Sequence, residues 1–252
     1  MFKIALDAGH GLYTPGKECL KALDPNVTKE WWLNQRICNL LENKLKAYSG
    51  YELKRMDDRT GKIDVALAQR TSNANTWGAD IYVSIHHNGG IKGGIGGGLI
   101  VIVYTKPSEE SLSYQKIIYN DLIATTGLKG NRATPMPKQN LHVLRETKMP
   151  AVLVECGFMD SATDVPIILS EKFADACAEG LLKSLVEIGK LTKKSVGFKD
   201  IEGHYAEDVI KDLASKGILK GVSEDKYEPD RLVTRAEMAV IADRIIKYLG
   251  GK

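Results

Sequence analysis

Residues 81–88 read I-Y-V-S-I-H-H-N, an apolar run that ends abruptly in two histidines and an asparagine. A short apolar run with several β-forming residues and no proline is typical of a buried β-strand. Two other apolar runs end in the same way. Residues 3–6 lead into D-A-G-H-G at residues 7–11, and residues 151–154 lead into Glu155. The sequence therefore predicts three buried strands, each followed by polar groups.

These three strands are expected to bring His10, His86 and Glu155 to one edge of a sheet, because binding groups in open α/β sheets gather beyond the carboxyl ends of the strands. Further elements alternate along the chain. Helices are predicted at residues 30–48, 65–77, 108–126 and 171–188, and strands at residues 51–56 and 99–104. Asp64 is expected to cap the second helix. This alternation predicts an α/β fold with a mostly parallel sheet covered by helices on both faces.

The composition is that of an ordinary globular protein, since 43% of the 252 residues are hydrophobic and 27% are charged. The net charge of +3, without a basic block, gives no reason to expect nucleic acid as a partner. No apolar run approaches the roughly 18 residues that span a membrane. Residues 1–4 lead directly into the first predicted strand, so we expect synthesis in the cytoplasm without a signal peptide.

The composition changes at residues 190–197, a stretch of Lys, Thr, Ser and Gly that is typical of a linker. We therefore expect one domain at residues 1–189 and a small helical module at residues 198–252. In this module, T-R-A-E at residues 234–237 predicts a capping box, in which the Thr and Glu side chains bind each other's first-turn amides. A module of about 55 residues buries little surface, so we expect it to pack on a partner surface.

His10 and His86 are candidate metal ligands, because imidazoles and carboxylates are the usual ligands of zinc and catalytic zinc sites keep three of them. Glu30 is the candidate for the third ligand. It follows a loop at residues 11–29 that must return past the same edge of the sheet, and a helix start favours a carboxylate. No local spacing links these residues, and a histidine at a strand end is often purely structural. The residues alone leave both interpretations open.

Six short blocks follow one another in a fixed order within residues 2–189. They are L-D-A-G-H-G at 6–11, E-W-W-L-N at 30–34, L-K-R-M-D-D-R at 53–59, A-Q-R-T-S-N-A-N at 68–75, V-S-I-H-H-N at 83–88 and P-A-V-L-V-E-C-G-F at 150–158. In this order the chain resembles the zinc-dependent N-acetylmuramoyl-L-alanine amidases, the family of bacterial autolysins and phage endolysins that detach the stem peptide from peptidoglycan.

By this resemblance His10, Glu30 and His86 are ligands of Zn²⁺, and Glu155 is the catalytic carboxylate that moves a proton beside the metal. The family fold is built around a mixed sheet. The implied reaction is hydrolysis of the amide bond between N-acetylmuramic acid and L-alanine, with peptidoglycan as the substrate. Without a signal peptide, the protein would act on the cell wall as a phage or prophage endolysin.

Three alternatives to this function remain. The protein could be a host autolysin, or a zinc peptidase that cuts within the stem peptide. It could also be a wall-binding protein without activity, which is disfavoured because all the expected ligands and the carboxylate are present.

Other polar residues in these motifs have open roles. Candidates for substrate binding are Asn88, His87 and His142. His87 follows His86 in the predicted strand and should face away from it, so packing or exposure is the alternative role. Arg70 is more typical of a structural hydrogen-bonding residue. Cys156 should point into the packing on the other side of the strand from its neighbour, which disfavours a catalytic cysteine.

Three blocks occur in the C-terminal module: F-K-D-I-E-G-H-Y-A at residues 198–206, G-I-L-K-G at 217–221 and T-R-A-E at 234–237. Together they resemble one S-layer homology motif. The resemblance implies binding to a secondary cell-wall polymer of Gram-positive envelopes, with Arg235 as the candidate for an anionic group.

Such motifs usually occur as three copies, whereas this chain has one, and Tyr205 stands where the family mostly has Trp. We therefore consider two hypotheses, a homo-oligomer that pools the single motifs and docking of the motif on the catalytic domain.

Overall fold

The computed structural model of the chain describes residues 1–194, 197–223 and 225–249. Two predicted segments lie partly outside the described residues. Residues 195 and 196 belong to the predicted linker, and residues 224 and 250–252 belong to the predicted C-terminal module.

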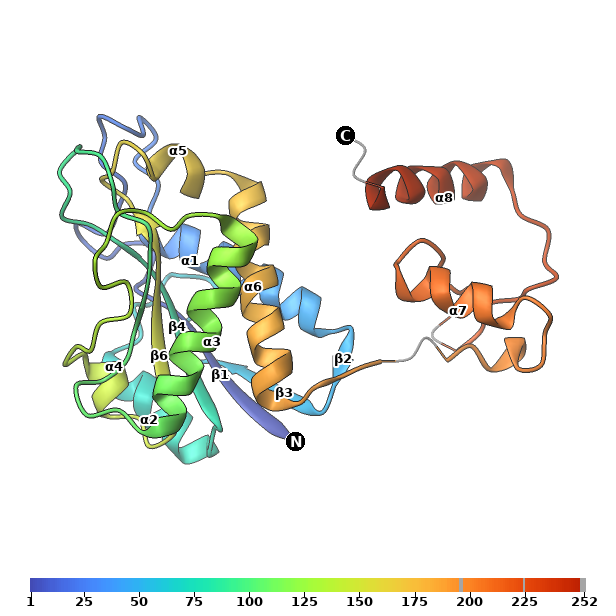
Figure 1. The fold of residues 1–252 in the computed structure, drawn as a ribbon, viewed down its shortest axis with the longest axis horizontal. Coiled ribbons are helices and arrows are strands. Elements are labelled where there is room, and N and C mark those ends of the chain that lie inside the picture. The colour runs from blue at the N-terminus through green and yellow to red at the C-terminus, as the bar shows by residue number, and fades with distance from the viewer. Residues whose placement is uncertain (195–196, 224, 250–252) are drawn as a thin grey trace. The chain divides into compact units, whose positions relative to one another are not determined.

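The chain divides into two units, Met1–Thr192 and Lys193–Lys252, and Figure 1 shows the fold of each. None of the helices in the described ranges combines the length and the hydropathy that a membrane crossing needs.

The first unit is built on a five-stranded sheet in the order β3-β1-β4-β6-β5. Its strands are β1 (Phe2–Ala8), β3 (Tyr51–Arg55), β4 (Ile81–Asn88), β5 (Leu99–Ile102) and β6 (Ala151–Phe158). β1 pairs in parallel with β3 and β4, and β4 pairs in parallel with β6, whereas β5 runs antiparallel to β6. The predicted mixed, mostly parallel sheet is thus confirmed. A second sheet joins β2 (Tyr48–Ser49) and β7 (Thr192–Lys193).

Helices lie on both faces of the five-stranded sheet (Figure 1). They are α1 (Glu30–Leu45), α2 (Leu67–Trp77), α3 (Glu109–Thr126), α4 (His142–Arg145), α5 (Val165–Ile168) and α6 (Glu171–Gly189). Successive side chains of β1 enter two different apolar cores. Leu6 packs in the larger core with α1, α3 and α6, and Ala5 packs in the smaller one with α2 and α4. Burial of both faces explains why the strands read as continuous apolar runs.

Asp64 does not cap α2, contrary to the prediction. The helix begins at Leu67, and its N-terminal flanking residue makes no side-chain cap. The Asp64 carboxylate instead accepts hydrogen bonds from the Thr14 hydroxyl at 2.6 Å and from the Arg70 guanidinium at 3.0 Å. These partners are distant in sequence or charged, and they compete successfully with the helix amides.

Other element ends differ from the prediction by a few residues. α1 ends at Leu45 rather than at residue 48, because Tyr48 enters β2, and β6 continues to Phe158. The helices α4 and α5 were not predicted, because four residues are too few to show a helical periodicity.

The second unit contains the 3₁₀ helix η1 (Lys199–Ile201) and the helices α7 (Glu207–Ser215) and α8 (Arg235–Tyr248). Its core is small and consists of Phe198, Ile201, Ile210 and Ala214. The predicted capping box at the start of α8 is confirmed, since the side chains of Thr234 and Glu237 bind each other's backbone amides. α8 itself contributes no buried residue, and Met238 on its apolar face is 52% exposed.

Candidate metal centre and active site

His10, Glu30 and His86 lie together at one edge of the sheet. His10 follows the end of β1, Glu30 opens α1, and His86 lies near the end of β4. The Nε2 atom of His10 lies 3.4 Å from Oε2 of Glu30, and Nδ1 of His86 lies 3.0 Å from Oε1. The two imidazole rings meet edge to face with centroids 4.9 Å apart. One ligand atom of each residue lies within 4.8 Å of the others.

Strand pairing explains why these residues meet. In the pairing of β1 with β4, Ala8 lies opposite Ile85, so the chain that leaves the end of β1 at Gly9 and His10 is level with His86 in β4. Glu30 is held against the same edge, because the backbone N–H of His87 donates a hydrogen bond to its Oε1 atom at 3.1 Å.

Gly9 leaves the space that the His86 imidazole occupies. A Cβ atom on residue 9 would lie 2.0 Å from Cε1 of His86, far inside van der Waals contact. Any side chain at Gly9 would therefore have to displace His86 or the end of β1. The glycine before His10 is a steric requirement of the site.

The protonation states of His10 and Glu30 suit metal binding. Burial lowers the pKa of His10 to about 4, and the Glu30 carboxylate offsets only part of this effect. Burial acts to raise the pKa of Glu30, but the hydrogen bond from His86 and its charge bring that pKa down to about 2. At neutral pH His10 is a neutral imidazole and Glu30 an anion, which are the forms that bind metal. Burial lowers the pKa of His86, but the hydrogen bond and the charge of Glu30 raise it above its usual value, so a metal must displace a proton there.

The three residues fit a divalent cation. The Oε2 atom of Glu30 is buried, and no residue in the described part of the chain gives it a hydrogen bond. A buried carboxylate oxygen without such a partner is costly unless something else binds it. Two imidazole nitrogens and one carboxylate form a ligand set of the kind found in catalytic metal sites that keep a position open. The cluster is thus a group of side chains that could hold a metal ion.

Glu155 lies beside this cluster. It is opposite His86 in the parallel pairing of β6 with β4. Its Oε2 atom is buried and has no hydrogen-bond partner among the described residues. Burial raises the pKa of Glu155 to about 7. The charge of Glu30 also raises this pKa, whereas the charges of His86 and Lys17 lower it. A carboxyl group with this pKa can accept and release a proton near neutral pH.

A cavity of about 320 Å³ opens beside the cluster, lined by His10, His86, the end of β1 and the residues at the start of α2. Lys17 is a further charged residue at the site that was not predicted, and its Nζ atom lies 3.9 Å from Oε2 of Glu30. Lys17 comes from the loop before α1 and belongs to no motif, so only the folded loop reveals its position.

The three residues predicted to bind substrate do not lie together. His87 is 3% exposed, and its Nδ1 atom lies 2.8 Å from Oδ1 of Asn34 on α1. The Oδ1 atom of Asn88 accepts a hydrogen bond from the backbone N–H of Gly89. His142 lines a separate groove of about 420 Å³ between α2 and α4, which shares no lining residue with the cavity at the cluster.

Cys156 is fully buried in the larger core, as strand alternation predicts for the neighbour of a site residue.

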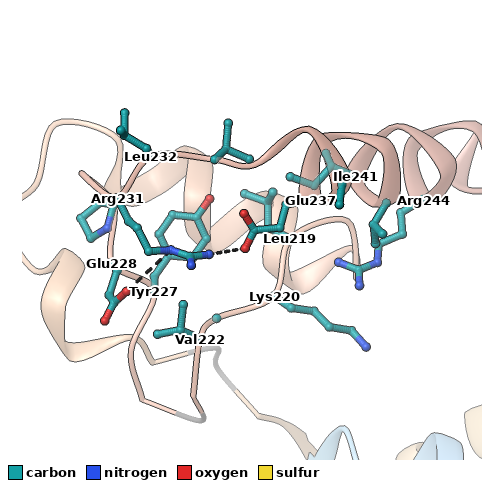
Figure 2. A pocket seen from close by; sticks show the side chains of 15 residues that line it. Leu219, Lys220, Val222, Tyr227, Glu228, Arg231, Leu232, Glu237, Ile241 and Arg244 are labelled. Atoms are coloured by element: carbon teal, nitrogen blue, oxygen red, sulfur yellow. Dashed lines mark hydrogen bonds and ion pairs between the residues drawn. The ribbon is translucent and has the colours of Figure 1, made fainter.

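The second unit has its own groove, of about 550 Å³, between the loops that follow α7 and one face of α8 (Figure 2). Its cationic lining residues are Lys220, Arg231 and Arg244. Arg231 forms an ion pair with Glu237 and is thereby partly neutralised. Arg235, the residue predicted to meet an anionic polymer, opens α8 and is not among the lining residues.

Comparisons with known proteins agree with this geometry. The N-acetylmuramoyl-L-alanine amidase family matches residues 4–187, and the S-layer homology domain matches residues 197–239. The N-acetylmuramoyl-L-alanine amidase CwlM of Bacillus licheniformis is 32% identical over 202 residues, which cover 80% of this chain and 74% of that protein. The endolysin of Bacillus phage SPP1 is 32% identical over 192 residues, which cover 76% of this chain and 68% of that protein.

A solved structure shares the fold. The crystal structure of N-acetylmuramoyl-L-alanine amidase from Clostridium difficile 630 superimposes with a TM-score of 0.66 at 27% identity, and the match covers 74% of this chain and 95% of that one. With a family match over residues 4–187 and relatives above 30% identity over most of its length, the chain belongs to the N-acetylmuramoyl-L-alanine amidase family.

Proposed function

We propose that the first unit hydrolyses the amide bond between N-acetylmuramic acid and L-alanine in peptidoglycan, with Zn²⁺ held by His10, Glu30 and His86 and with Glu155 as the proton carrier. The observation that carries the proposal is the cluster itself: three potential ligand atoms lie within 4.8 Å of one another, next to Glu155, whose buried Oε2 atom has no hydrogen-bond partner among the described residues. Membership of the amidase family supplies the reaction class.

Zinc in such a site acts as a Lewis acid and makes water a nucleophile at neutral pH. Glu155 accepts a proton from the attacking water while the water oxygen forms a bond to the amide carbonyl carbon. When the carbon–nitrogen bond breaks, Glu155 passes this proton to the leaving nitrogen of L-alanine. Burial raises the pKa of Glu155 to about 7 in the metal-free protein, a value suited to a group that accepts and releases a proton near neutral pH.

The test is the chemistry of the products. Purified cell walls are digested with the protein, with and without a chelator, and the soluble fragments are identified by mass spectrometry. The proposal requires free N-terminal L-alanine and its loss when zinc is removed. Cleavage inside the stem peptide would instead identify a zinc peptidase. Walls that are not degraded would support a wall-binding protein without activity.

We also propose a lytic role for this activity, as a phage or prophage endolysin. Similarity to the SPP1 endolysin supports that role, and similarity to a Bacillus licheniformis amidase supports the alternative of a host autolysin. Deletion of the coding sequence distinguishes them. An endolysin is required for release of phage particles after induction, whereas an autolysin is required for wall turnover in cells without phage.

For the second unit we propose anchoring to an anionic secondary cell-wall polymer. The support is the match to the S-layer homology domain and the cationic side chains at α8, namely Arg235 at its start and Lys220 and Arg244 in the groove. The measurement is cosedimentation of the full chain with walls before and after chemical removal of the polymer. Arg235→Ala and the pair Lys220→Ala and Arg244→Ala tell which cations bind it.

We further propose that the second unit pairs with a second copy of the chain through α8. Apolar side chains of this helix are exposed, since Met238 is 52% and Ile246 is 53% exposed, and the unit's own core contains none of the helix's residues. Burial of these side chains against an equivalent helix would remove apolar surface from water. Light scattering of the full chain should give a dimer or larger species that Met238→Glu converts to a monomer. A strict monomer for the wild-type chain contradicts the pairing.

A further inference from the structure

All five N–H groups of Arg70, on α2, donate hydrogen bonds to groups at the end of β1 or in the loop before α2. Nη1 donates to the Asp7 carboxylate and to the carbonyl oxygen of Ala8 at 2.8 Å. Nη2 donates to the carbonyl oxygen of His10 at 3.0 Å, and the other two N–H groups bind the loop. The guanidinium is 1% exposed. Its hydrogen bonds are therefore made entirely with protein groups, and two of them hold backbone carbonyls on either side of Gly9.

The backbone that Arg70 holds is unusual. His10 has a φ angle of +66°, in the left-handed region that residues with a side chain rarely adopt. This conformation turns the chain after β1 and directs the His10 imidazole toward Glu30. The carbonyl between the two held by Arg70, that of Gly9, accepts a hydrogen bond from the Asn34 amide at 3.1 Å. Three consecutive carbonyls are thus bound by side chains from α1 and α2.

We propose that Arg70 is a positioning residue of the metal centre, which keeps His10 in its left-handed conformation so that the imidazole is oriented before the metal arrives. The inference rests on the proposed zinc site. Hydrogen-bonding partners outside the ligand set commonly change metal affinity by 10- to 100-fold when they are removed. Arg70 acts on the main chain of a ligand rather than on its ring.

Arg70 could instead serve only the stability of the fold, through its buried ion pair with Asp7. Arg70→Lys separates the two roles. Lysine keeps a positive charge for Asp7, but its single nitrogen cannot reach two carbonyls, the Asp7 carboxylate and the loop at the same time. A purely structural role predicts a lower melting temperature with unchanged zinc affinity. A positioning role predicts weaker zinc binding by folded protein.

The experiment measures the zinc dissociation constant of the full chain by competition with a chromophoric chelator. We expect Arg70→Lys to bind zinc about 10- to 100-fold more weakly than the wild type. The cobalt-substituted variant should also show a changed visible spectrum, which reports ligand geometry. The matched control is Arg36→Lys. The Arg36 guanidinium also binds two backbone carbonyls, those of Ile168 and Leu169, at 2.9 and 3.1 Å. This control should keep the wild-type affinity and spectrum.

A second variant covers the case in which Arg70→Lys fails to fold by circular dichroism. Asp7→Asn leaves Arg70 in place but removes the charge that orients it, and we expect a smaller loss of zinc affinity in the same direction. Wild-type affinity in whichever of the two variants folds, or an equal loss in Arg36→Lys, overturns the inference. A wild-type chain that binds no zinc overturns the proposed function itself, so the two failures are distinguishable.

Discussion

Glu155 lies directly opposite His86 across the parallel pairing of β6 with β4. One residue belongs to the candidate ligand set and the other does not, although each occupies the same level on its strand. The His86 imidazole contacts Glu30, whereas the Oε2 atom of Glu155 is buried without a hydrogen-bond partner among the described residues. The register of two strands thus places a candidate metal ligand and a candidate proton carrier side by side.

Substitution of Glu155 by Gln should remove catalysis and keep the metal. The amide has the size of the carboxyl group but cannot carry the proton, so we expect kcat to fall by about 10²- to 10⁴-fold. Turbidity loss of cell walls measures the rate, and metal analysis of the purified variant should give the wild-type zinc content. The control is Cys156→Ala on the opposite side of the same strand, which should keep its activity per folded molecule. Wild-type turnover by Glu155→Gln contradicts the assignment.

Gly9→Ala should disrupt the metal centre, because the new methyl group would lie 2.0 Å from the His86 ring. We expect zinc binding weakened by at least 10-fold, since the ring must move away from Glu30. Gly89→Ala is the matched control at the end of β4, where a Cβ atom would meet nothing closer than 3.9 Å. Isothermal titration with zinc compares the two variants. Equal affinities would show that the end of β1 or the His86 ring can move to accommodate the methyl group without weakening zinc binding.

Removal of the metal should lower the stability of the first unit as well as its activity. A ligand that binds only the folded state at 100 times its dissociation constant adds about 2.7 kcal/mol to the free energy of unfolding. Differential scanning calorimetry before and after dialysis against a chelator measures this change, and added zinc should restore the melting temperature. His86→Ala should melt at the same temperature with and without zinc. A zinc-dependent change in the melting temperature of His86→Ala would show that zinc binds at a site that does not include His86.

The capping box of α8 should titrate at low pH. Hydrogen bonds from the backbone and side chain of Thr234, and then from Arg231, lower the pKa of Glu237 from 4.5 to about 2. The stability that this carboxylate gives α8 is therefore complete above about pH 4.5 and is lost as the pH falls toward 2. The amide proton shift of Thr234, followed by NMR in the full chain, should have a midpoint near pH 2. Glu237→Gln should abolish the transition, and a midpoint near 4.5 would exclude the hydrogen bond.

The sequence was sufficient for the elements that carry the site. Apolar runs without proline located the strands β1, β4 and β6, and the helices predicted at residues 30–48, 108–126 and 171–188 correspond to α1, α3 and α6. These patterns are local, because strand and helix periodicity are set by neighbours a few residues apart. The same runs showed that His10, His86 and Glu155 come after the apolar part of a strand. In the structure His10 follows β1, whereas His86 and Glu155 lie within β4 and β6 and face each other.

Other features are not encoded locally. The antiparallel direction of β5 depends on the path of the loop before it and on pairing with β6, which is distant in sequence. Asp64 has the residue type of a helix cap but binds Thr14 and Arg70 instead. Lys17 lies near Glu30 only because the loop before α1 folds back over the sheet edge.

By itself, the sequence determined the main strands and helices of the first unit, the polar residues that come after the apolar part of three strands, and the capping box of α8. Only the tertiary structure decided that His10 adopts a left-handed conformation, that Arg70 binds the carbonyls around it, and that His87 faces Asn34. The physical reason is that these contacts join residues some 50 to 60 positions apart, so they arise from the packing of α1 and α2 against the sheet and leave no periodic pattern in the chain.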